Sequence, residues 1–220
     1  MIEADNLLVI APHPDDEVLG CGGTIALAAE RGAKVHVLVV FDGAAGDPEG
    51  RFDVTEYVDR RRCEARAGGA HLGVSDYTFW NLPEGHLALE HEIEAGAWRL
   101  QQLIDRIQPD LVLAPWEGDD HPDHKTVSKS VQRMLALSSK SDSRERKRSR
   151  KYDVWGFEVW SPLDAEHLVD VSSVWGAKLS ALREHRTQLE YADLLGRMTS
   201  LARRHNTGLL ESFALLKSAA

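Results

Sequence analysis

The chain has 220 residues, of which 43% are hydrophobic and 28% are charged, and its formal net charge is −9. This composition is typical of a water-soluble globular protein, and we expect a single domain over residues 1–220. The acidic balance argues against nucleic acid as a partner, and no apolar stretch approaches the roughly 20 residues that span a bilayer. The N-terminus shows no secretory pattern, and Cys21 and Cys63 form no disulfide framework, so we expect a cytoplasmic protein.

Short apolar runs alternate with amphipathic segments along the whole chain. The first run predicts a buried strand at 7–10, and the segment at 18–30 predicts the helix that follows it. Further along, we predict a strand at 34–41, a mobile Gly- and Ala-rich loop at 42–50, a helix at 56–72, a strand at 77–80, a helix at 91–107, strands at 110–114, 154–160 and 168–171, and a helix at 174–186. This alternation favours a three-layer α/β sandwich with a mostly parallel central sheet.

One segment breaks this composition. Residues 138–151 contain no apolar side chain and are rich in Lys, Arg and Ser. Such a run is either a basic patch for phosphate groups or a flexible, solvated surface loop. We favour the loop, because the chain is acidic elsewhere.

A polar cluster follows the first predicted strand immediately. It contains His13, Asp15, Asp16 and Glu17. One acidic residue would be enough to cap the next helix and complement its dipole, so the surplus of carboxylates indicates chemistry. In open α/β sheets, ligands bind beyond the carboxyl ends of the strands.

A second polar cluster repeats this arrangement after the strand at 110–114. The loop that follows contains His121, Asp123 and His124. Neighbouring parallel strands end at the same edge of a sheet, so we expect the two clusters to converge there. Their imidazoles and carboxylates suit Zn²⁺, which takes about three protein ligands in catalytic sites and keeps one position for water.

The two clusters suggest a division of roles. We expect His13, Asp16 and His124 to hold the metal, which leaves Asp15 free to take a proton from an activated water. As an imidazolium, His121 would stabilise an oxyanion or donate a proton to the leaving amine. We expect Asp123 to orient His121 and keep it charged.

Several further residues are candidates for the site or its surroundings. We expect Trp116 to line the pocket and Arg51 or Arg61 to contact a substrate hydroxyl or phosphate, although both arginines are also compatible with an ordinary surface position. The glycines at 20, 22 and 23 resemble a phosphate loop, but the preceding carboxylates disfavour an anion there. Tryptophan-bearing segments near the C-terminus are compatible with a homo-oligomer.

The motifs Pro-His-Pro-Asp-Asp-Glu at 12–17 and His-Pro-Asp-His at 121–124 resemble those of the LmbE-like family, also called the PIG-L deacetylases. The resemblance extends to Arg61 and Glu64, the segments at 72–74 and 169–171, Lys178 and the segment at 185–188. It implies a Rossmann-like enzyme that uses zinc, or another divalent metal such as Fe²⁺, to remove acetyl from an N-acetylglucosamine-type sugar conjugate in pathways such as mycothiol and bacillithiol synthesis.

The resemblance also implies roles for individual residues. It places the metal ligands on His13, Asp16 and His124, the general base on Asp15, and the acid or electrostatic helper on His121. Some relatives carry Tyr two residues before the second motif, or Arg directly before it, where this chain has Asp119 and Asp120. His121 is then the one expected oxyanion helper.

Metal-dependent N-deacetylation of a small GlcNAc-type conjugate is therefore the leading hypothesis. The alternatives are hydrolysis of another amide or ester at the same site, and a metal- or sugar-binding module without turnover. The presence of Asp15 and His121 argues against the last alternative, because metal binding alone requires neither residue.

Overall fold

The computed structural model describes residues 4–140, 151–205 and 207–217, and within them seven strands form one sheet in the order β3-β2-β1-β4-β5-β7-β6. The strands are β1 (Asn6–Ala11), β2 (Lys34–Phe41), β3 (Asp76–Leu82), β4 (Leu111–Pro115), β5 (Asp153–Phe157), β6 (His167–Asp170) and β7 (Leu210–Lys217). The strands from β3 to β5 are parallel to one another, whereas β7 runs antiparallel to both β5 and β6.

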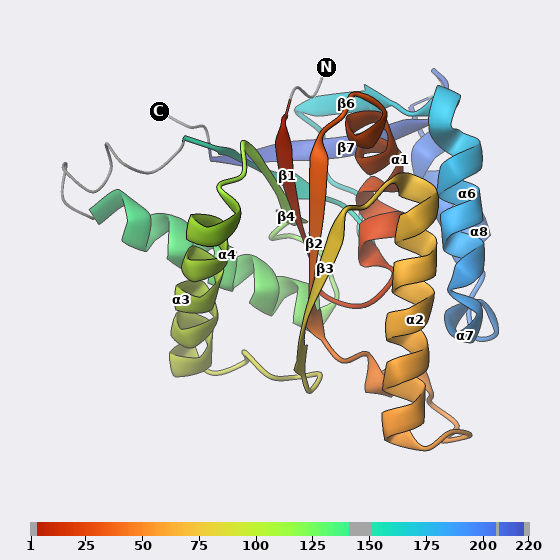
Figure 1. Ribbon diagram of the computed structural model, residues 1–220, viewed down its shortest axis with the longest axis horizontal. Helices are drawn as coiled ribbons and strands as arrows, with labels where there is room; N and C mark the ends of the chain where they lie inside the picture. Colours follow the sequence, from red (N-terminus) through yellow and green to blue (C-terminus); the bar gives the residue numbers. More distant parts are fainter. Residues whose placement is uncertain (1–3, 141–150, 206, 218–220) are drawn as a thin grey trace.

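Helices cover both faces of this sheet (Figure 1). One face carries α1 (Asp16–Glu30), α2 (Val54–Leu72), α6 (Trp175–Glu184) and α8 (Leu194–Arg203), and the other carries α3 (Glu90–Ile107) and α4 (Pro122–Lys140). The short helix α7 (Arg186–Leu189) and 3₁₀ turns at Ala44–Gly46 and Ser172–Val174 lie in the connections. Each face has its own apolar cluster. This arrangement confirms the predicted three-layer, Rossmann-like α/β fold.

The topology brings the two polar clusters together. Strand β1 pairs with β2 on one side and with β4 on the other, and Val9 lies opposite Leu113. The chain leaves these two neighbouring strands at the same edge and enters α1 and α4 there. Ligands favour this position in open α/β sheets.

Some predicted elements differ from the observed ones. Asp123 and His124 lie in the first turn of α4 and not on a loop, because Pro122 occupies the first position of a helix that packs through apolar residues such as Val127 and Val131. The strand predicted at 154–160 ends at Phe157. Residues 138–140 belong to α4, and the loop predicted over the rest of 138–151 lies outside the described residues except for its last position. Helix α4, helix α8 and strand β7 were not predicted from the sequence.

Among the residues that the structure describes, no helix is both long enough and apolar enough to cross a membrane.

The glycines of α1 allow close packing against the sheet. A Cβ atom built on Gly20 would lie 2.2 Å from the ring of Phe157, and one on Gly23 would lie 2.5 Å from Cβ of Val171. Cys21, between them, is fully buried, as predicted for a packed small side chain. Side chains therefore occupy the space that a phosphate would need above this segment.

Replacing Gly20 by alanine is expected to lower the free energy of unfolding by about 1–3 kcal/mol, because the new methyl group has no room beside Phe157. Urea denaturation measures this change. Gly176→Ala is the matched control, since a Cβ atom added to Gly176 in α6 would have nothing within 4 Å, and alanine there is expected to leave stability unchanged or raise it. Equal effects of the two substitutions would contradict the packing argument.

Candidate active site

The turn after β1 holds Asp15 in an unusual backbone conformation. Its φ is 145° and its ψ is −23°, a region that residues other than glycine seldom adopt. The Asp15 amide donates to Oε2 of Glu17 at 3.2 Å, and Arg61 donates to the Asp15 carboxylate at 3.1 Å and to the carbonyls of Pro14 and Gly43. Strain of this kind persists only where surrounding contacts impose it, and it is concentrated at functional sites.

Asp16 lies between two histidines that come from different strand ends. Its Oδ2 atom is 3.1 Å from Nδ1 of His13 and 3.1 Å from Nε2 of His124. The same oxygen accepts the backbone amide of His13 at 2.8 Å. Asp16 and His124 are almost completely buried, and His13 is 7% exposed. The structure thus brings together the three residues predicted as metal ligands.

The second ring nitrogen of each histidine faces another carboxylate. Nε2 of His13 lies 3.2 Å from Oδ2 of Asp123, and Nδ1 of His124 lies 3.4 Å from Oδ2 of Asp119. Asp123 was predicted to orient His121, but its carboxylate contacts His13 instead. Asp123 contacts His121 through its backbone amide, which donates to Nδ1 of His121 at 3.2 Å where α4 begins.

The carboxylates make this cluster strongly attractive to positive charge. Burial acts to lower the pKa of His13, but its contacts with Asp123 and Asp16 prevail and raise that pKa to about 9. Burial also opposes protonation of His124, but Asp16 and Asp119 raise its pKa to about 10. Burial acts to raise the pKa of Asp16, but the neighbouring His124 and His13 outweigh it and hold that pKa far below its usual range.

The pKa values of the two carboxyl groups on either side of Asp16 shift the other way, because burial prevails there. It raises the pKa of Asp15 to about 7, although the positive charge of Arg61 works against this shift. It also raises the pKa of Glu17 to about 8. The hydroxyl of Tyr77 donates to Oε1 of Glu17 at 3.0 Å, and the carboxyl group thereby links β3 to the turn that carries Asp15.

His121 differs from the other two histidines. It is partly exposed, and burial together with the positive charges of His13 and His124 lowers its pKa below the usual value. Its Nδ1 accepts the Asp123 amide, which assigns the proton of the neutral ring to Nε2. The structure therefore favours a neutral His121 rather than the imidazolium expected from sequence.

The donor set fits a divalent transition metal. Zinc bonds of about 2 Å separate tetrahedral ligands by about 3.3 Å, close to the 3.1 Å that separates Asp16 Oδ2 from each histidine nitrogen. Within the described residues, neither ring nitrogen of buried His124 makes a well-aligned hydrogen bond, although both face carboxylates. One nitrogen from each of His13, His121 and His124 also lies within 4.8 Å of the others, which leaves His121 as an alternative ligand.

The three residues predicted to contact substrate also make contacts within the chain, and their role toward substrate stays a prediction. Arg61 is 3% exposed and holds the Asp15 turn from the interior. Arg51 donates to Tyr191 at 2.7 Å and to Glu190 at 2.9 Å. Trp116 packs over Gly118 and Gly156, and its indole donates to the carbonyl of Ser161 at 3.1 Å.

Sequence reasoning missed two residues beside the second cluster. Asp119 is completely buried and accepts the amides of His121 at 2.9 Å and Trp160 at 3.0 Å. The ring centroid of Trp160 lies 6.5 Å from that of His121, so Trp160 lies beside the second cluster. The pair of adjacent aspartates, Asp119 and Asp120, directly before the second motif was the sequence feature that could have indicated a role for Asp119.

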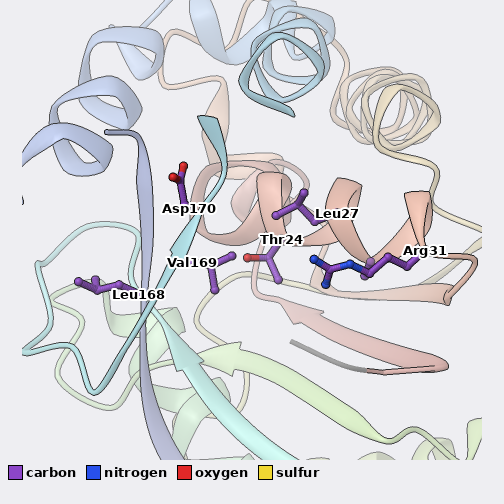
Figure 2. A pocket seen from close by; sticks show the side chains of 7 residues that line it. Thr24, Leu27, Arg31, Leu168, Val169 and Asp170 are labelled. Atoms are coloured by element: carbon purple, nitrogen blue, oxygen red, sulfur yellow. The ribbon is translucent and has the colours of Figure 1, made fainter. Parts of the chain in front are cut away.

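A separate pocket lies between α1 and β6 (Figure 2). Its lining residues are Thr24, Leu27, Ala28, Arg31, Leu168, Val169 and Asp170. Arg31 follows the C-terminal end of α1, whereas Asp16 begins that helix. The pocket is therefore distinct from the cluster of His13, Asp16 and His124.

Comparison with known proteins identifies the family. The family model "PIG-L: GlcNAc-PI de-N-acetylase" matches residues 8–135. The chain belongs to the PIG-L family. The matched region includes both polar clusters, so the predicted family resemblance is confirmed.

Individual relatives of this PIG-L chain differ in their named activities. A Bacillus subtilis (strain 168) protein named "Probable N-acetyl-alpha-D-glucosaminyl L-malate deacetylase 2" is 31% identical over 190 residues, which cover 84% of each chain. The 4-oxalmesaconate hydratase of Pseudomonas putida is 29% identical over 189 residues, covering 80% of this chain and 71% of the relative. The fold matches N,N'-diacetylchitobiose deacetylase from Pyrococcus horikoshii with a TM-score of 0.82 at 24% identity, over 97% of this chain and 84% of that one.

Proposed function

We propose that this protein is a zinc-dependent N-deacetylase that removes acetyl from a small GlcNAc-type sugar conjugate. The observation that carries the proposal is the position of Asp16 Oδ2, 3.1 Å from a nitrogen of both His13 and His124, with Asp15 held beside it. Relatives named as deacetylases of N-acetylglucosaminyl compounds support the substrate class.

His13, Asp16 and His124 would hold the metal. Asp123 and Asp119 face the remaining nitrogens of the two histidines, an arrangement that fixes ring orientation and raises ligand basicity in metal sites. When bound, the ion supplies Lewis acidity, which activates water and polarises an amide carbonyl. His121 is left out of this ligand set because its Nδ1 accepts the Asp123 amide. The neutral ring then carries its proton on Nε2, so neither nitrogen has a free lone pair for the ion.

Asp15 would transfer the protons, and His121 would stabilise the oxyanion. Arg61 and the Glu17 carboxyl group fix Asp15 from two sides, so its free oxygen is oriented to accept a proton from water as it attacks the acetyl carbonyl. His121 would donate a hydrogen bond from Nε2 to the developing oxyanion, and the departing amine would take up the proton that Asp15 has accepted from the water.

Acetate release across a panel of N-acetylated compounds tests this proposal. The panel contains GlcNAc, its oligomers, GlcNAc-malate, GlcNAc-inositol and acylated peptides, each assayed after chelation and after Zn²⁺ or Fe²⁺ is restored. We expect acetate release from at least one GlcNAc conjugate, loss of that activity on chelation, and recovery with metal. Acetate release from acylated peptides alone would contradict the proposed sugar substrate and indicate that the enzyme hydrolyses another class of amide.

The hydratase among the relatives defines the strongest competing outcome. A hydratase adds water across a carbon–carbon double bond, so it consumes an unsaturated acid and releases no acetate. Loss of ultraviolet absorbance from 4-oxalmesaconate, with no acetate from any sugar, would favour that reaction over deacetylation.

A further inference from the structure

A buried ion pair contacts helix α1 at a break in its backbone. Lys178 of α6 is 1% exposed and Glu211 of β7 is 3% exposed. The Lys178 ammonium donates to Glu211 Oε1 and, at 3.0 Å, to the carbonyl of Leu19. The Glu211 carboxylate accepts the backbone amides of Gly23 at 2.7 Å and Thr24 at 2.8 Å.

These contacts occupy the two ends of one regular helical hydrogen bond. In an α-helix the amide of Gly23 would donate to the carbonyl of Leu19. Between them, Cys21 has non-helical angles of φ −142° and ψ 21°. The carbonyl meets an ammonium and the amide meets a carboxylate, and each charge also complements the dipole of the helical segment that it contacts.

The segment before the break carries the acidic residues of the site. Residues 16–20 form only about one helical turn, too short to be stable as a helix alone. Asp16 and Glu17 lie in this turn, and Asp15 precedes it. The direction of the turn relative to the rest of α1 therefore depends on the contacts made at the break.

Hydrogen-bond partners are needed at this position because the backbone groups there are buried. Taking an ion pair out of water is costly, and well-packed apolar residues often replace such pairs without loss of stability. Here an apolar replacement would leave the Leu19 carbonyl and the Gly23 and Thr24 amides without these partners, so it would favour closing the break into a continuous helix.

We propose that Lys178 and Glu211 are positioning residues that fix the angle of the first turn of α1, and through it the placement of Asp15 and Asp16 against His13 and His124. The metal readout of this inference rests on the proposed function, whereas the backbone readout does not.

The test compares Lys178→Met, Glu211→Gln and the double variant K178M/E211M with the wild type. Hydrogen exchange of the metal-free proteins reports on residues 16–20, and titration with Co²⁺ reports affinity and, through its visible absorption, coordination geometry. Asp110→Asn is the matched control. The Asp110 carboxylate also accepts two successive amides, those of Asp5 and Asn6 at 2.9 Å, but at the opposite edge of the sheet.

We expect exchange at residues 16–20 to become at least tenfold faster in Lys178→Met and Glu211→Gln, with Co²⁺ affinity at least tenfold weaker and an altered spectrum. Asp110→Asn should lower the melting temperature without these changes. If the single variants fail to fold, K178M/E211M decides instead, because it leaves no unpaired buried charge, and we expect the same weaker Co²⁺ affinity, altered spectrum and changed exchange at residues 16–20 in it.

Wild-type exchange at residues 16–20 together with a wild-type Co²⁺ spectrum in the folded variants would overturn the inference and leave the pair a purely structural role. A wild-type protein that binds no Co²⁺ would instead overturn the proposed metal site, and the exchange measurement would still decide the positioning role. Metal binding without acetate release would affect only the proposed reaction.

Discussion

Replacing Asp15 by asparagine is expected to lower kcat/KM for acetate release by about 10²–10⁴-fold, the usual contribution of a general base, while Zn²⁺ still binds. Asparagine is nearly isosteric with aspartate, so we expect the contacts that impose the unusual backbone conformation of this position to impose it in the variant as well. Its amide oxygen can still accept a hydrogen bond from Arg61, but the side chain cannot take a proton from water. Steady-state kinetics and Zn²⁺ competition with a chromophoric chelator measure the two quantities.

The control for this substitution is Asp120→Asn, which removes the same charge beside the second motif. The Asp120 side chain is 86% exposed and accepts a hydrogen bond from Ser161, so it faces away from the buried cluster. We expect less than about a threefold change in kcat/KM, as for a screened surface charge. Comparable losses in the two variants would indicate a general effect of charge, and full activity of Asp15→Asn would remove Asp15 from the reaction.

The placement of the site was predictable because it depends on short-range patterns. An apolar strand followed by His13, Asp15 and Asp16 repeats after the strand that precedes His121 and His124, and parallel topology brings such strand ends together. Neither step requires knowledge of a distant contact. The fold class followed from the same alternation of strands and helices.

The partners of individual side chains were not predictable in this way. Asp123 turns toward His13 because α4 begins at Pro122, and the polar start of that helix has no clear periodicity. Arg61 faces the interior because the register of α2 points it at the Asp15 turn. Glu211 reaches the break in α1 from 188 residues further along the chain, a contact that only the antiparallel β7 establishes.

Replacing Asp16 by asparagine is expected to weaken Zn²⁺ binding more than the loss of a carboxylate that only contacts a ligand. Loss of such an outer carboxylate typically weakens binding by about 10–100-fold. Asp16 supplies the one oxygen near both His13 and His124, and an amide in its place has less negative charge to offer the ion. Asp119→Asn, which alters a carboxylate behind His124, should fall within the 10–100-fold range. Chelator competition on the purified variants gives this ranking, and a thermal melt of each metal-free protein checks that it is folded.

The same measurement distinguishes the two ligand sets that the structure allows. If His13, Asp16 and His124 hold the ion, His121→Gln retains Zn²⁺ affinity and loses kcat, because His121 then acts on the reacting carbonyl alone. If the three histidines hold the ion, His121→Gln loses affinity as strongly as any ligand variant, and Asp16→Asn costs no more than Asp119→Asn. The distances favour the ligand set of His13, Asp16 and His124, since Asp16 Oδ2 is 3.1 Å from a nitrogen of each of these two histidines. His121, in contrast, already accepts an amide at 3.2 Å.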